Sequence, residues 1–203
     1  MIKKIIKGTL PFIFKDKPDV ENYNQQDWDN QYTSGRWDYL DQISELAHYS
    51  VIVGYCQYLH PEANILDVGC GEGLLQQRLS VLPYKKYTGI DMSAIAIDNA
   101  NNKFADDRTE FYAADGSNYL SDIKYDLIIF NESLYCFNDA VKILNHYKTM
   151  LKKDGVFIIS MHVQEVSNYH WPNIEKHFNI IDKIHITNND DISWNCAAVK
   201  PTN

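Results

Sequence analysis

The sequence from residue 65 to residue 73 reads Ile65-Leu66-Asp67-Val68-Gly69-Cys70-Gly71-Glu72-Gly73. An apolar run that passes into alternating glycines predicts a buried strand, a tight turn and the start of a helix. Glycine allows backbone conformations that a Cβ forbids, and it lets a ligand approach the main chain closely. The first N–H groups of the following helix have no partner within the helix and attract polar ligands. We therefore interpret this stretch as a nucleotide-type ligand site rather than as a turn that is merely tight.

Short apolar runs alternate with helical stretches on both sides of this turn. The predicted strands are Asn64 to Val68, Tyr87 to Ile90, Glu110 to Ala113, Asp126 to Phe130 and Val156 to Met161. The predicted helices are Gln42 to Leu59, Glu72 to Ser80, Ala94 to Lys103 and Ala140 to Leu151. Continuous apolar runs of this length suit strands that are buried on both faces of a parallel sheet. The alternation predicts an α/β, doubly wound fold.

The sequence after residue 179 predicts an antiparallel hairpin. Ile180 to Thr187 and Ile192 to Val199 flank Asn188-Asn189-Asp190-Asp191, a cluster that favours a reversing turn. No repeat and no linker rich in Gly, Ser or Pro divides the 203 residues. We expect an N-terminal extension over residues 1–41 and one domain over residues 42–203.

Charge and cysteine usage exclude several classes of partner. Lys and Arg number 19 against 27 Asp and Glu, and this net charge of −8 disfavours binding to a phosphate backbone, so we expect no nucleic-acid partner. The four cysteines are widely spaced and form no C-x-x-C pair, so no metal site is expected. Such usage is typical of a reducing cytoplasm.

Residues 1–14 combine three lysines with a short apolar run. The run is too short to span a bilayer, and it lacks the long apolar core and cleavage site of a signal peptide. Two interpretations remain: an exposed or packing tail, and a weak association with an anionic lipid surface.

The glycine spacing separates two nucleotide-type cofactors. The dinucleotide fingerprint G-x-G-x-x-G places its third glycine at position 74, where this chain has Leu74. The chain instead reads D-x-G-x-G-x-G and in this respect resembles the class I S-adenosylmethionine-dependent methyltransferases over residues 62–162. The resemblance implies a Rossmann-like, mostly parallel, seven-stranded sheet and S-adenosylmethionine as cofactor, with S-adenosylhomocysteine as product. It also implies that Asp67, Gly69 and Gly71 bind that cofactor.

Two further acids follow the next two predicted strands. The carboxylate of Asp91 can accept two hydrogen bonds from vicinal ribose hydroxyls. The resemblance implies this role for Asp91 and implies that Met92 packs against the adenine. Taken alone, Asp91 suits NAD or a helix cap equally well. The resemblance also implies that Asp115 and Gly116 hold the adenine, although an Asp-Gly pair is also ordinary turn chemistry.

The residues after the fourth predicted strand face the crevice in which ligands of open α/β sheets bind. The resemblance implies that Asn131 contacts the methionine part of the cofactor through its backbone, while Glu132 and Tyr135 face the acceptor. Amino-methyltransferases of nucleobases often carry N/D-P-P-Y/F here, whereas this chain has Asn131-Glu132-Ser133-Leu134. This departure weakens the case for a nucleobase amine as substrate.

A segment before the sheet, Asn30 to Trp37, resembles the lid that small-molecule methyltransferases fold over the cofactor. In that interpretation Tyr32 and Trp37 exclude water, and Arg36 pairs with the methionine carboxylate. The alternative is that these aromatic residues cover the outside of the sheet.

Methyl transfer needs a proton acceptor only when the acceptor is a hydroxyl or a protonated amine. His162 directly follows the fifth predicted strand, so we predict it as the proton acceptor, with Glu132 as second choice. The alternative for His162 is an ordinary polar contact. His146, His177 and His185 are predicted to be structural.

Residues 164–177 lie between the fifth predicted strand and the hairpin and contain several aromatic side chains. This segment either forms a loop that shapes the acceptor pocket or a helix that covers the core.

The sequence thus predicts an enzyme that moves a methyl group from S-adenosylmethionine to an O or N atom of a small organic acceptor. One alternative is a noncatalytic S-adenosylmethionine-binding subunit that supports a partner enzyme. A second is an NAD-dependent oxidoreductase, which Leu74 disfavours. The sequence indicates neither the acceptor nor the oligomeric state.

Overall fold

Residues 23–202 of the chain are described by a computed structural model. Their strands are β1 (Asn64–Val68), β2 (Lys86–Asp91), β3 (Thr109–Ala113), β4 (Tyr125–Asn131), β5 (Leu151–His162), β6 (Phe178–Thr187) and β7 (Ser193–Pro201). Their α-helices are α1 (Gln25–Thr33), α2 (Leu46–Leu59), α3 (Leu74–Leu79), α4 (Ala94–Phe104), α5 (Ala140–Lys148) and α6 (Glu165–His177). Short 3-10 helices are η1 (Asp38–Asp41), η2 (Ile43–Glu45) and η3 (Leu134–Cys136).

All seven strands belong to one sheet with the order β3-β2-β1-β4-β5-β7-β6. Strands β1 to β5 pair in parallel, whereas β7 is antiparallel to both β5 and β6. The predicted doubly wound α/β sheet with an antiparallel C-terminal hairpin is therefore confirmed. The strand order reverses between β1 and β4, and open α/β sheets bind ligands beyond the carboxyl ends of the strands at such a point.

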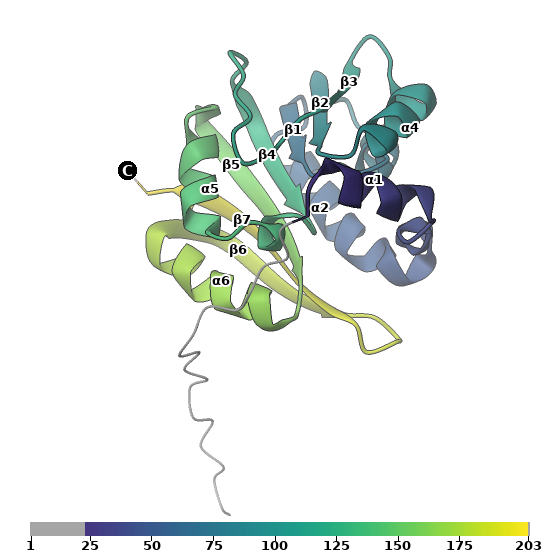
Figure 1. Cartoon of the computed structure of the whole chain (residues 1–203). Helices are drawn as coiled ribbons and strands as arrows, with labels where there is room; N and C mark the ends of the chain where they lie inside the picture. The colour runs from purple at the N-terminus through teal and green to yellow at the C-terminus, as the bar shows by residue number, and fades with distance from the viewer. Residues whose placement is uncertain (1–22, 203) are drawn as a thin grey trace, which may run out of the picture.

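Two apolar clusters hold the helices on opposite faces of the sheet (Figure 1). On one face α2, α3 and α4 contribute the buried side chains Tyr49, Ile52, Leu75, Leu79 and Ile97. On the other face α5 and α6 contribute Leu144, Tyr147, Trp171 and Ile174. Because both faces are covered, the central strands are apolar throughout, which explains the continuous runs in the sequence.

Several predicted boundaries shift for identifiable reasons. Helix α3 begins at Leu74 rather than at Glu72, because Gly73 has a φ of 82° and forms the N-cap. Strand β5 begins at Leu151, which pairs with Tyr125, so the preceding helix ends earlier than predicted. The first turn of the helix predicted from residue 42 is the separate 3-10 helix η2.

Residues 164–177 form a helix rather than a loop. Trp171 and Ile174 on α6 are buried in the core, so of the two interpretations of this segment the structure favours core coverage. A side-chain and backbone capping box at Gln164 and Ser167 starts the helix.

Within residues 23–202 no helix is both long and apolar enough to cross a bilayer. The two interpretations of residues 1–14 lie outside the described residues. The proposed boundary at residue 41 stays a prediction.

Candidate active site at the carboxyl edge of the sheet

The glycine turn after β1 adopts backbone conformations that glycine reaches without the strain that a Cβ causes. Gly69 and Gly71 have φ values of 77° and 52°, in the left-handed region. A Cβ on Gly69 would lie 2.5 Å from the Cβ of Ser133, and one on Gly71 would lie 2.7 Å from Tyr32 Oη. The turn therefore carries no side chain of its own at Gly69 and Gly71, and Ser133 and Tyr32 lie against its main chain at the strand-order reversal.

Asp91, at the end of β2, is tied to this turn. Its Oδ2 accepts a 2.9 Å hydrogen bond from Gly71 N–H, and its Oδ1 accepts one of 2.9 Å from Ser93 N–H. Burial raises the pKa of Asp91, while these two hydrogen bonds lower it. Each oxygen keeps a further lone pair, so the carboxylate can still accept hydrogen bonds from a diol.

Asp67, on β1, is a buried carboxylate with one unsatisfied oxygen. Its Oδ2 accepts a 2.5 Å hydrogen bond from the hydroxyl of Tyr87, a partner that the sequence analysis missed. Its Oδ1 has no hydrogen-bond partner among residues 23–202. Burial raises the pKa of Asp67 to about 7. A buried polar atom without a partner is costly, so this oxygen fits a polar ligand lying over the turn.

Helix α1 carries Tyr32, whose hydroxyl lies against Gly71 of the glycine turn. Asp29 anchors the helix, because its Oδ1 accepts hydrogen bonds from Ser93 Oγ at 2.7 Å and from Ile95 N–H at 3.2 Å. The ring of Trp37 lies 6.4 Å from that of Tyr32, and burial raises the pKa of Tyr32. Tyr32 and Trp37 thus lie close together beside the glycine turn, and their role as a lid stays a prediction.

Three other residues predicted to bind the cofactor are Arg36, Met92 and Asn131. Arg36 is exposed, with its guanidinium carbon 5.6 Å from the centre of the Trp37 ring. Met92 follows Asp91 and is partly exposed. Met92 and Asn131 thus lie at the carboxyl edge of the sheet, because β2 ends at Asp91 and β4 ends at Asn131.

The Asp115-Gly116 pair follows β3 and makes a local turn. The carboxylate of Asp115 accepts hydrogen bonds from Ser117 N–H, Ser117 Oγ and Asn118 Nδ2 at 2.8, 2.8 and 3.1 Å. The carbonyl of Gly116 accepts a 2.9 Å hydrogen bond from Tyr147 Oη. Ordinary turn chemistry accounts for these contacts, and the adenine role stays a prediction.

The two predicted proton acceptors meet at one corner. Glu132 follows β4 with a φ of 55°, a strained conformation for a residue with a Cβ. Its Oε1 accepts a 2.6 Å hydrogen bond from Ser160 Oγ, and its Oε2 accepts one of 2.7 Å from the backbone N–H of His162. Burial raises the pKa of Glu132. The His162 ring packs edge-on against Trp194, with centroids 6.2 Å apart.

A buried Glu45 and His48 pair joins this corner and was not predicted. His48 Nδ1 lies 3.1 Å from Asn131 Oδ1, and Nε2 lies 3.3 Å from Glu45 Oε2. The His48 ring also stacks on Trp194 at 5.1 Å. The available signal was weak: His48 shares the inward helical face of Ile52, where a polar residue needs a partner.

Two tyrosines complete the corner. Burial, followed by the nearby Glu132, raises the pKa of Tyr135. Burial, followed by Glu45 and Glu132, raises the pKa of Tyr39. The arrangement therefore offers carboxylates and phenols to a second ligand, beside the glycine turn.

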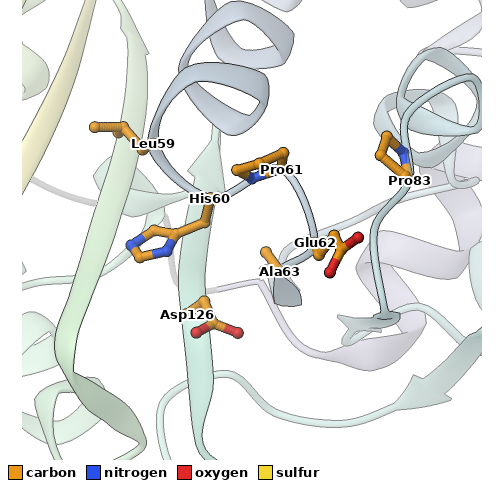
Figure 2. A pocket seen from close by; sticks show the side chains of 7 residues that line it. All are labelled: Leu59, His60, Pro61, Glu62, Ala63, Pro83 and Asp126. Carbon is orange, nitrogen blue, oxygen red and sulfur yellow. The ribbon is translucent and has the colours of Figure 1, made fainter.

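A pocket at the opposite edge of the sheet contains none of the predicted residues (Figure 2). It is lined by Leu59, His60, Pro61, Glu62, Ala63, Pro83 and Asp126. Asp126 is already satisfied there by Lys152 Nζ at 2.7 Å and Asn64 N–H at 2.8 Å. We therefore place the candidate active site at the carboxyl edge.

Comparisons with known proteins identify the family of the chain. A family model described as a methyltransferase domain matches residues 59–195. A malonyl-[acyl-carrier protein] O-methyltransferase of Ilyobacter polytropus is 33% identical over 99 residues, which cover 48% of this chain and 37% of that protein. A ribosomal protein L11 methyltransferase of Clostridium perfringens is 26% identical, covering 71% of this chain and 44% of that protein. The chain thus spans less than half the length of these curated relatives.

Solved structures share the fold at low sequence identity. The N-methyltransferase NodS of Bradyrhizobium japonicum, in complex with S-adenosylhomocysteine, superposes with a TM-score of 0.69 at 18% identity, covering 86% of this chain and 100% of that one. The magnesium protoporphyrin IX methyltransferase of Synechocystis, with bound S-adenosylmethionine, superposes with a TM-score of 0.68 at 18% identity, covering 90% and 100%.

Proposed function

We propose, from the premise that this chain belongs to the methyltransferase domain family and is a class I S-adenosylmethionine-dependent methyltransferase, that it methylates an O or N atom of a small organic acceptor. The observation that carries the proposal is the glycine turn of β1, which has two left-handed glycines at the strand-order reversal and is held by Asp91 through Gly71 N–H. Its neighbour Asp67 has a buried oxygen left for a polar group.

Different residues around the turn would bind different parts of the cofactor. Asp91 would accept hydrogen bonds from the ribose hydroxyls, while Gly69 and Gly71 let the cofactor lie against the main chain. Met92, Asp115 and Gly116 would surround the adenine. Asn131, Tyr32, Arg36 and Trp37 would enclose the methionine part.

S-adenosylmethionine supplies, when bound, an electrophilic methyl group on a sulfonium. The chain's contribution is to hold the acceptor in line with that group and to exclude water, an effect that can reach roughly 7–11 kcal/mol. Tyr32 and Trp37 would close the site, and Glu132 or His162 would take up the acceptor proton.

Calorimetric titration tests the cofactor half directly. We expect S-adenosylhomocysteine to bind the purified chain and NAD not to bind; binding of NAD alone would contradict the proposal. Transfer of a radiolabelled methyl group to a panel of small molecules tests the acceptor half. A chain that binds S-adenosylhomocysteine yet methylates nothing would instead fit a noncatalytic subunit.

A further inference from the structure

Building on the proposed function, we infer that the methylated atom is an amine nitrogen and that Glu132 receives its proton. The inference concerns the acceptor corner beside the glycine turn, which we define as Tyr39, Glu45, His48, Glu132 and Tyr135. These side chains come from η1, η2, α2, the end of β4 and η3.

Two carboxylates give this corner its charge. Glu45 is only 4% exposed, and Glu132 is partly exposed, so neither is fully hydrated. Tyr39 lies within electrostatic range of both. Partly desolvated carboxylates attract an ammonium group and repel a carboxylate acceptor, and the faces of neighbouring aromatic rings add to the attraction of a cation.

The groups facing Glu132 are identifiable on each neighbouring element. Strand β5 presents Ser160 and His162, α2 presents His48, and η3 presents Tyr135. Ser160 and His162 use one lone pair on each carboxylate oxygen. Tyr135 also hydrogen-bonds to this carboxylate, so of its four lone-pair positions one remains to accept a hydrogen bond from an amine.

A second observation, separate from the charge of the carboxylates, is a buried ring nitrogen of His48 in this corner. His48 is 0% exposed, and its Nε2 faces Glu45 at 3.3 Å without forming an aligned hydrogen bond to any described residue. Buried polar atoms in native proteins normally have such a partner. The acceptor corner thus contains a buried polar atom without an aligned hydrogen bond, and this feature suits the binding of a polar ligand.

Two lysines contact the opposite edge of the sheet, away from the acceptor corner. Lys124 Nζ donates to Thr149 O at 2.6 Å, and Lys152 Nζ donates to Asp126 at 2.7 Å. Arg36 is a basic residue near Tyr39. In our proposal its guanidinium pairs with the methionine carboxylate of the cofactor. Arg78 lies over the ring of Tyr49 and is paired with Asp41 at 3.3 Å. Each of these four cations thus has another partner, which favours an amine over a carboxylate as acceptor.

The proposed step balances in protons and electrons. An acceptor that arrives as an ammonium ion first gives one proton to the Glu132 carboxylate, which becomes a neutral acid. The freed nitrogen lone pair then forms the N–C bond while the S–C bond breaks and leaves its electron pair on sulfur. The product is a methylated ammonium ion, and Glu132 returns its proton to water. Burial raises the pKa of Glu132, which prepares this carboxylate to hold a proton.

A panel of matched acceptors tests the inference. Each alkyl or aryl amine is offered with the corresponding alcohol and carboxylate, with radiolabelled S-adenosylmethionine, and its binding in the presence of S-adenosylhomocysteine is followed by calorimetry. We expect methylation and binding of amines. Methylation of alcohols or carboxylates instead, or binding of S-adenosylhomocysteine with neither binding nor methylation of any amine, overturns the inference. Failure to bind S-adenosylhomocysteine overturns the proposed function itself.

Paired variants test the role of Glu132. Glu132→Gln keeps the shape of the side chain and should lower kcat for the amine by about 100-fold and remove the acidic limb of the pH profile. Its affinity for S-adenosylhomocysteine should stay within about threefold. The control Glu62→Gln removes an exposed carboxylate at the opposite edge and should change none of these values. An unchanged pH profile in Glu132→Gln would refute the proton transfer.

Discussion

The carboxylate of Asp91 accepts a 2.9 Å hydrogen bond from the backbone N–H of Gly71, so the end of β2 holds the glycine turn of β1 in place. Asp91→Asn keeps one carbonyl oxygen but loses the charge and the second acceptor. We expect the affinity for S-adenosylhomocysteine to fall about 10- to 100-fold, since hydrogen bonds to charged groups contribute about 1.5–3 kcal/mol. Calorimetry measures this change, with the exposed Asp98→Asn on α4 as control. Equal affinities for the two variants would contradict it.

Gly69→Ala should damage both stability and cofactor binding. The left-handed backbone costs a residue with a Cβ about 1–2 kcal/mol, and this Cβ would also meet that of Ser133 at 2.5 Å. We expect an unfolding free energy lower by about 1–3 kcal/mol in urea and at least tenfold weaker binding of S-adenosylhomocysteine. Gly54→Ala on α2 is the matched control, because a Cβ there meets nothing within 4 Å. It should stabilise the helix by about 0.5–1 kcal/mol and leave binding unchanged.

Asp67 should make the stability of the fold depend on pH. Its pKa is raised to about 7 by burial, so between about pH 4 and pH 7 the folded chain holds a proton that the unfolded chain has lost. Its contribution is therefore fully present below about pH 4 and is lost progressively as the pH rises from about 4 to 7. Relative to Asp67→Asn, the unfolding free energy of the wild type should fall by about 2–3 kcal/mol between pH 5 and pH 8. Parallel curves for the two proteins in urea titrations would show that the raised pKa is wrong.

Replacement of His162 should separate the two proposed proton acceptors. Glu132 receives its hydrogen bond from the backbone N–H of His162, which His162→Ala retains. If Glu132 takes the proton, His162→Ala should keep the acidic limb of the kcat/KM profile and lose less than about tenfold in kcat. If His162→Ala loses the acidic limb of the profile and Glu132→Gln keeps it, the proton acceptor is His162.

The sequence predicted the sheet and the glycine turn well because both depend on local chemistry. Buried parallel strands need continuous apolar runs, and a left-handed turn needs glycine. Strand β5 was predicted too short because residues near its start are exposed and polar. Lys152, Lys153 and Asp154 carry no apolar signal. Leu151 pairs with Tyr125 and Val156 with Leu127, so these residues lie at an irregularity between two paired positions that only the folded chain reveals.

The acceptor corner could be predicted only in part. Glu132 and His162 each end a strand and so carry a positional signal. His48 instead lies within a helix, and its partner Asn131 is 83 positions away along the chain. Nothing in a helical pattern indicates which polar side chain across the fold will meet it, so such long-range polar pairs need the three-dimensional structure.

The position of β7 in the sheet affects how the protein emerges from the ribosome. Strand β7 follows β6 along the chain, yet in the sheet it lies between β5 and β6 and pairs with both. During synthesis the outer edge of β5 therefore stays unpaired until β7 has left the exit tunnel. Unpaired strand edges promote aggregation, so nascent chains that stall before residue 193 should need chaperones more than the completed fold does.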